Sequence, residues 1–195
     1  TEFTYSGRID QDSGDYIKYE NLQATNSIGR GISIDNRTYV LNELQVVNCD
    51  ASETALHGLI HHATIGNVVF DGVTVERCGK AARDNNYNGP RPAYFSAGKY
   101  MAATDTVEIK NCVFHKSWQE AILAGDGQKD FHNNRIHATY VGIYIISCQN
   151  SDSWNNIVTG STDTYYHRGT GNDAGILIAV ETGSLMSNQY NNLWN

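Results

Sequence analysis

The fold is decided by the stretch KNCVF at 110–114 and its repeats, HNNRI at 132–136, WNNIV at 154–158 and YNNLW at 190–194. In each copy an Asn is followed three residues later by a large apolar residue. The first three copies lie 22 residues apart, and the fourth follows after 36 residues. Self-similarity at a fixed short period is typical of proteins built by stacking one structural unit on the next.

Weaker copies extend the repeat towards the start of the chain, with Asn21, Glu43 and Gly72 at the position of the Asn. A second block precedes each Asn by about a dozen residues and consists of a small residue followed by a short run rich in β-branched residues. Such runs are typical of strands. The copies are GISI at 31–34, GLIH at 58–61, GKYM at 98–101, AILA at 121–124, GIYI at 142–145 and GILI at 175–178.

A unit of 22 residues is too short for two helices with their turns, but it suits three short strands joined by tight bends. No such unit can bury its own apolar face, so stacking must supply the core. The sequence therefore predicts an all-β single-stranded solenoid of about seven coils with loop insertions, forming one domain over residues 1–195.

This pattern resembles the right-handed parallel β-helix superfamily, the pectate-lyase-like fold of many polysaccharide-active proteins. In that family, stacked Asn side chains form a hydrogen-bonded ladder inside a bend, because Asn tolerates unusual backbone angles and carries both a donor and an acceptor. The resemblance implies a ladder of Asn111, Asn133, Asn155 and Asn191. Glu43 and Gly72 depart from the family's pattern.

Charge and hydropathy limit the partners. The net charge is −7, and the 14 Lys and Arg residues do not cluster, which argues against nucleic acid and against strongly anionic polysaccharides. No apolar run approaches the roughly 18 residues of a membrane span. The abrupt first and last residues, without a recognisable signal peptide, lead us to expect a mature or excised segment with neighbouring domains, further coils or end-to-end stacking in the parent protein. The resemblance to polysaccharide-active proteins implies a secreted, extracellular parent with an appended catalytic domain.

The four cysteines permit an oxidising compartment without requiring one. Cys49 lies six residues after Glu43 and Cys78 six residues after Gly72, so the repeat predicts that they share a register on adjacent coils. Strands about 4.8 Å apart allow a disulfide there. Stacked buried thiols are the alternative, and both stay open at this point. We expect Cys112 and Cys148 to be small core residues.

Aromatic residues gather near the sheet formed by the second, Gly-led block. Two insertions, at 79–97 and 161–174, fall in the bend before this sheet, and long loops in a regular coil often carry function. Alternation would send the middle side chain of each Gly-led strand outward. A groove lined with Tyr and Trp suits an oligosaccharide, since the rings pack against sugar C–H bonds. The predicted carbohydrate-binding residues are Tyr94, Tyr100, Trp118, Tyr140, Tyr144, Tyr165, Tyr166 and Arg168.

No catalytic set and no metal site can be recognised. Asp126 and Asp130 could hold a calcium ion, but a polar turn explains them as well, so we expect no cofactor. His61 and His62 are consecutive on a predicted strand and should face opposite sides, which argues against a shared metal. Asp35, Glu120 and Asp126 are the acids to which we would turn if the protein were an enzyme.

Three functions remain. The missing catalytic set favours a non-catalytic module that binds a neutral plant polysaccharide, xylan or another hemicellulose, similar to the β-helical modules of enzymes that degrade plant cell walls. The second is a polysaccharide lyase or glycoside hydrolase of the same superfamily with dispersed acids. The third is a structural or adhesive fibre segment of the tailspike kind.

Overall fold

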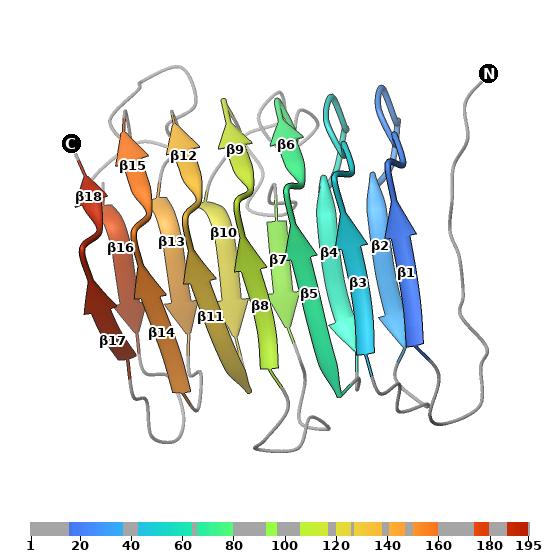
Figure 1. Cartoon of the computed structure of the whole chain (residues 1–195). Coiled ribbons are helices and arrows are strands. Elements are labelled where there is room, and N and C mark those ends of the chain that lie inside the picture. The colour runs from blue at the N-terminus through green and yellow to red at the C-terminus, as the bar shows by residue number, and fades with distance from the viewer. Residues whose placement is uncertain are drawn as a thin grey trace.

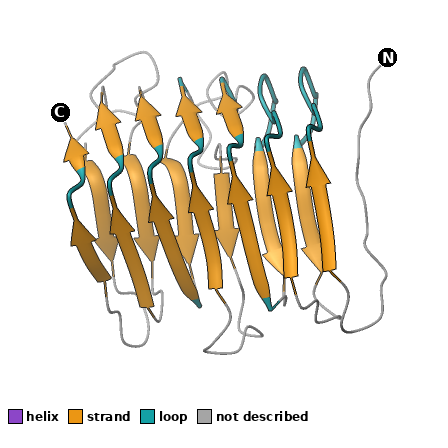
Figure 2. Ribbon diagram, viewed as in Figure 1, coloured by secondary structure: helices purple, strands orange, loops and turns teal. Residues whose placement is uncertain are grey.

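The computed structural model describes residues 16–36, 43–63, 66–79, 93–96, 106–116, 120–125, 127–137, 141–146, 150–159, 174–179 and 187–194. These residues form strands in three parallel sheets and no helix, and so no helix that could cross a membrane. The parallel β-solenoid predicted from the repeat is confirmed (Figures 1 and 2).

The seven-stranded sheet contains β1 (Tyr16–Glu20), β3 (Glu43–Val47), β5 (Asn67–Asp71), β8 (Thr106–Lys110), β11 (Gln128–His132), β14 (Asn150–Trp154) and β17 (Ser187–Tyr190). The six-stranded sheet contains β2 (Ile32–Asn36), β4 (Leu59–Ala63), β7 (Ala93–Ser96), β10 (Glu120–Gly125), β13 (Val141–Ile146) and β16 (Ala174–Ala179). The five-stranded sheet contains β6 (Thr74–Glu76), β9 (Val113–His115), β12 (Arg135–His137), β15 (Ile157–Thr159) and β18 (Leu193–Trp194).

Each coil passes through the three sheets in turn. In Figure 1 the front strands run upward, the strands behind run downward and the chain advances from right to left, which is a right-handed winding. Within the described residues, five consecutive coils carry all three strands, from β4–β6 to β16–β18. After β1 and β3 the third side is a loop with single bridges at Gln23 and Asp50 (Figure 2). The prediction of about seven such coils was therefore too high.

The repeated Asn marks the bend between the seven-stranded and five-stranded sheets. At every bend one residue has a positive φ, between 49° and 68°, and its N–H donates to the last carbonyl of the next strand in the sheet wherever a next strand follows, at 2.8–3.2 Å. Asn and Gly adopt this conformation most readily. The residues are Asn21, Asn48, Gly72, Asn111, Asn133, Asn155 and Asn191.

Glu43 was wrongly assigned to this bend. It begins β3 and pairs with Tyr16 and Asn67, while Asn48 occupies the bend. A strict step of 22 residues from Asn21 missed the longer first coil.

The Asn ladder exists, but it lies one residue later than predicted. Asn134 Nδ2 donates to Asn156 Oδ1 at 2.9 Å, and Asn156 Nδ2 donates to Asn192 Oδ1 at 2.9 Å. Asn134 and Asn156 are fully buried, whereas the bend residues Asn133 and Asn155 are exposed. A residue of positive φ turns its own side chain outward here and aims the following one into the solenoid.

Cys112 stands in line with this ladder, because its backbone N–H donates to Asn134 Oδ1 at 3.0 Å. Cys49 likewise follows its bend residue, Asn48, whereas Cys78 follows Arg77 at a second bend of positive φ. Cys49 and Cys78 therefore do not share a register, and both are buried free thiols. The disulfide alternative was wrong.

The core changes character along the solenoid. In the early coils the inward residues of the seven-stranded sheet are apolar, such as Val68 and Phe70. Further along the same inward rows, Lys129 follows Val107, and Ser151 and Ser153 come next in register. The later coils consequently fill this side of their interior with polar side chains and the Asn ladder.

Candidate functional site

The six-stranded sheet is where the aromatic site was predicted. The residues expected to form its outward row are in register as Ser33, Ile60, Tyr94, Leu123, Tyr144 and Leu177, and of these Ile60 and Leu123 are buried. The strand predicted at 98–101 was wrong, since β7 is Ala93–Ser96 and Tyr94 takes the place expected for Tyr100. The small residue that leads this strand is Ala93 and not the Gly at 98.

Two of the eight predicted residues fall within described strands, Tyr94 on β7 and Tyr144 on β13, with Leu123 between them in register. The Tyr144 side chain is half-buried. The other predicted residues lie outside the described residues, and their role stays a prediction: Tyr100, Trp118, Tyr140, Tyr165, Tyr166 and Arg168. Asp126 also lies outside the described residues.

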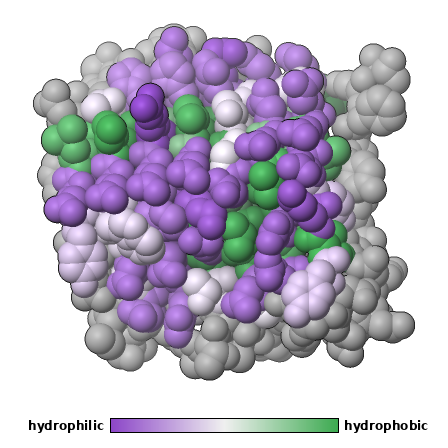
Figure 3. Space-filling view, in the orientation of Figure 1, coloured by the Kyte–Doolittle hydropathy of each residue, from purple (hydrophilic) through white to green (hydrophobic). Residues whose placement is uncertain are grey.

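The described residues instead bring polar and aromatic groups together on the outward face of the seven-stranded sheet (Figure 3). Alternation along each strand points Leu44 and Val46 inward and their neighbours outward. Glu108, Asp130 and Asp152 follow one another in register on β8, β11 and β14. The next outward row, two residues further along each strand, consists of Lys110, His132, Trp154 and Tyr190.

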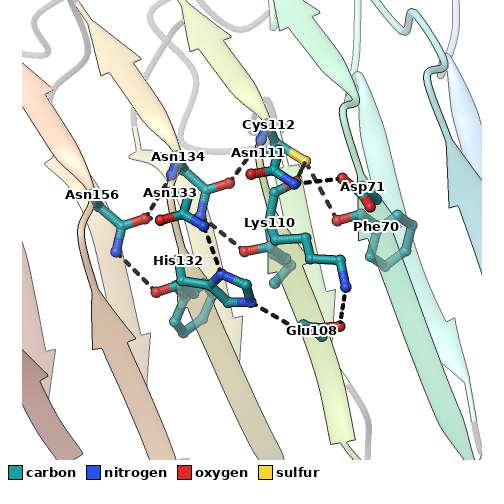
Figure 4. A network of polar contacts seen from close by, with 12 residues as sticks. Phe70, Asp71, Glu108, Lys110, Asn111, Cys112, His132, Asn133, Asn134 and Asn156 are labelled. Carbon is teal, nitrogen blue, oxygen red and sulfur yellow. Dashed lines mark hydrogen bonds and ion pairs between the residues drawn. The ribbon is translucent and has the colours of Figure 1, made fainter.

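A hydrogen-bond network holds the first part of this face (Figure 4). Lys110 Nζ donates to Glu108 Oε2 at 2.9 Å, and His132 Nε2 lies 2.8 Å from Glu108 Oε1. Asn133 Nδ2 lies 3.2 Å from His132 Nδ1. A neutral ring with its proton on Nε2 satisfies both contacts, because Nε2–H then donates to Glu108 and Nδ1 accepts from Asn133.

The fixed His132 ring supports Trp154. Their ring centroids are 4.2 Å apart and the planes are tilted by only 6°. Since the two residues sit on adjacent strands about 4.8 Å apart, the stacked rings stand on edge from the sheet and do not lie flat on it. His132 is buried and Trp154 is partly exposed, so the Trp154 ring is the member of this pair that reaches solvent.

The carboxylates differ in their electrostatics. Burial raises the pKa of Glu108, but hydrogen bonds from Lys110 and His132 outweigh it, so that its pKa lies below the ordinary value. The pKa of Asp130 is raised by burial and then by the negative charges of Asp152 and Glu108. Among the described residues, no group of three or more His, Cys, Asp or Glu side chains is arranged to hold a metal ion.

Exposed carboxamides border the face. Asn111, Asn133, Asn155 and Asn191 project at the bend that follows β8, β11, β14 and β17. Asn111 Nδ2 donates to Asp71 Oδ1 at 2.8 Å. The coils of β8, β11 and β14 therefore each carry a carboxylate, a cation or ring, and a carboxamide in the same order.

Sequence reasoning missed this face although its signal was within the repeat. The residues of the second row directly precede the repeated Asn, and the carboxylates lie three residues before it. In the sequence these positions are indistinguishable from the structural repeat itself, whereas the Gly-led strands carry the more conspicuous Tyr residues.

Comparison with family models, curated proteins and solved structures finds no match to this chain.

Proposed function

We propose that the protein binds a neutral polysaccharide, without catalysis, on the outward face of the seven-stranded sheet. The supporting observation is the row of Glu108, Asp130 and Asp152 beside Trp154 and Tyr190. Planar carboxylates and carboxamides can each pair with neighbouring sugar hydroxyls, while aromatic side chains supply apolar contact. Tyr190 is 54% exposed and open to such contact.

Charge supports a neutral ligand. The described outward side chains of this sheet include two lysines and six carboxylates, namely Glu20, Glu43, Asp71, Glu108, Asp130 and Asp152. A polyuronate would be repelled here. Xylan or another hemicellulose, with secretion and an appended catalytic domain, is the biological setting that the β-helical fold suggests by analogy.

A second candidate is glycoside hydrolysis. Glu108 and Asp130 are in register on adjacent strands, and their pKa values move in opposite directions. Such a pair is what an acid and a base or nucleophile require. In this reading Asp130 would be the proton donor and Glu108 the ionised partner.

Affinity electrophoresis against soluble xylan, other neutral glycans and polygalacturonate tests the proposal, with the same mixtures assayed for new reducing ends. We expect retardation by a neutral glycan, no product and no retardation by polygalacturonate. Trp154→Ala should weaken binding by about 1–3 kcal/mol if the ring is a central contact. Tyr16→Ala is the matched control, because Tyr16 is a 73% exposed aromatic on the same sheet, away from the carboxylate row.

Other results would redirect the assignment. Loss of binding in Tyr144→Ala but not in Trp154→Ala would move the site to the six-stranded sheet, as the sequence predicted. New reducing ends that disappear in Asp130→Asn would establish the hydrolase. Neither binding nor product would favour a structural or adhesive fibre segment.

A further inference from the structure

We propose that the polysaccharide lies along the solenoid axis, across β8, β11, β14 and β17, with one sugar unit on each coil. This inference rests on the proposed function and specifies how the ligand is held and which kind of chain fits. It follows from how the surface chemistry repeats in two directions.

Along the axis, two outward lines keep their chemical type. One line meets a carboxylate on each of β8, β11 and β14, and the line along the bends meets a carboxamide at each coil, while the row between them, Lys110, His132, Trp154 and Tyr190, changes from coil to coil. The groups are Glu108, Asp130 and Asp152 in the first line and Asn111, Asn133, Asn155 and Asn191 in the second.

Along a strand, by contrast, chemical type changes at each outward position. On β14 the order is Asp152, then Trp154, then Asn155 at the bend. A polymer of identical units gains most where each unit meets the same contacts. The axial direction offers that arrangement and the strand direction does not.

The spacing also fits. Adjacent strands lie about 4.7–4.9 Å apart, so each row presents one polar group at that interval. The axial length of one sugar in an extended β-1,4-linked chain is close to this interval. Neighbouring units of such a chain are rotated about the chain axis and offer their hydroxyls to alternate sides, where the carboxylate line and the carboxamide line border the path. A kinked α-linked chain would lose register after one or two units, so the ligand is an extended β-linked chain with free hydroxyls along both edges.

The contact groups are held ready for binding on at least part of this path. Glu108 is fixed by Lys110 and His132, and His132 in turn supports the Trp154 ring. Side chains that are already ordered lose less entropy on binding. The surface is therefore a preformed strip and needs no rearrangement to accept a straight chain.

Glycine scanning of the bend tests the direction of the chain. Asn111→Gly, Asn155→Gly and Asn191→Gly each remove one carboxamide at a positive φ, from 49° to 54°, that glycine adopts without strain. Asn21→Gly, at a φ of 57° on the first described coil, is the matched control outside the strip. Binding of xylobiose and xylohexaose to each variant is measured by calorimetry.

We expect all three variants inside the strip to lose affinity for the hexasaccharide by about two- to tenfold each, the worth of one hydrogen bond, while Asn21→Gly loses none. The disaccharide should bind more weakly and respond to no more than two neighbouring coils. Hexasaccharide binding that depends on a single coil, or that is no tighter than disaccharide binding, would overturn the axial arrangement and leave the proposed function standing. Absence of binding by either sugar and by longer neutral glycans would overturn both.

Discussion

Asn156 is the side chain on which the interior of the later coils depends most. Its Oδ1 accepts from the backbone N–H of Asn134 at 3.0 Å and from Asn134 Nδ2 at 2.9 Å. Its Nδ2 lies within 2.9–3.0 Å of Phe131 O, Ser153 Oγ and Asn192 Oδ1. The residue is fully buried, so water does not replace these contacts. We therefore expect Asn156→Ala to be strongly destabilising.

The size of the effect follows from the groups left behind. In Asn156→Ala at least three buried groups lose a partner: the Asn134 N–H, the Asn134 Nδ2 and the Phe131 carbonyl. Asn134 Nδ2 keeps its bond to Ile109 O at 2.9 Å, which softens the loss. At about 1–3 kcal/mol for each unsatisfied buried group, the free energy of unfolding should fall by about 3–6 kcal/mol.

Asn155→Gly is the matched control, because it replaces the neighbouring Asn at a φ of 54°, a conformation that glycine adopts without strain. Urea denaturation followed by circular dichroism should show a large drop in the midpoint for Asn156→Ala and a change within about 1 kcal/mol for Asn155→Gly. Amide exchange adds a local readout, because coils contact only their neighbours and protection should be lost first in β11, β14 and β17. Equal midpoints for the two variants would refute the ladder as a source of stability.

Three further predictions concern other parts of the solenoid. Lys116 has a φ of 48°, which costs a residue with a side chain about 1–2 kcal/mol. Because glycine also loses more backbone entropy on folding, Lys116→Gly should stabilise the fold by a net amount of about 0.5–1 kcal/mol in urea titrations. A lower urea midpoint for this variant would contradict the prediction. Burial raises the pKa of Cys112 to about 12. We therefore expect iodoacetamide to leave Cys112 unmodified in the native protein at neutral pH and to alkylate it in urea, as measured by peptide mass spectrometry. Rapid labelling of the native protein would show instead that this coil opens. Burial and then the charges of Asp152 and Glu108 raise the pKa of Asp130 above its unfolded value, so its ionised form opposes folding at neutral pH. Asp130→Asn should therefore raise the urea midpoint at neutral pH, and this gain in stability should vanish below the unfolded pKa of Asp130. A gain in stability that persists in acid would refute the electrostatic cause.

The bends could be predicted from the sequence because their backbone demands particular residues. A positive φ selects Asn or Gly, and the repeats at Asn111, Asn133 and Asn155 therefore marked real structural positions. Counting failed where the spacing was irregular, since no chemical feature sets how many residues lie between Asn21 and Asn48. The same limit shifted the predicted strand from 93–96 to 98–101.

The candidate site was harder to predict because its members are ordinary strand residues. Glu108, Lys110 and His132 have unremarkable neighbours in sequence, and they become a network only once β8 and β11 are placed in register. The stacking of His132 on Trp154 likewise depends on a step of 22 residues between coils. Short-range spacing within one strand does not reveal such pairs.

The change of core from apolar to polar along the solenoid has a mechanical consequence. Coils with an apolar core resist opening through the apolar area they bury. Coils joined by hydrogen bonds of Ser153, Asn156 and Asn192 resist opening through directional bonds, which are lost together once water enters. Under heat or tension we expect the described stack to unwind from β14 and β17 towards β3. A polysaccharide bound lengthwise over those same coils would stabilise them against unwinding. The affinity for the ligand and the stability of these coils would therefore increase or decrease together.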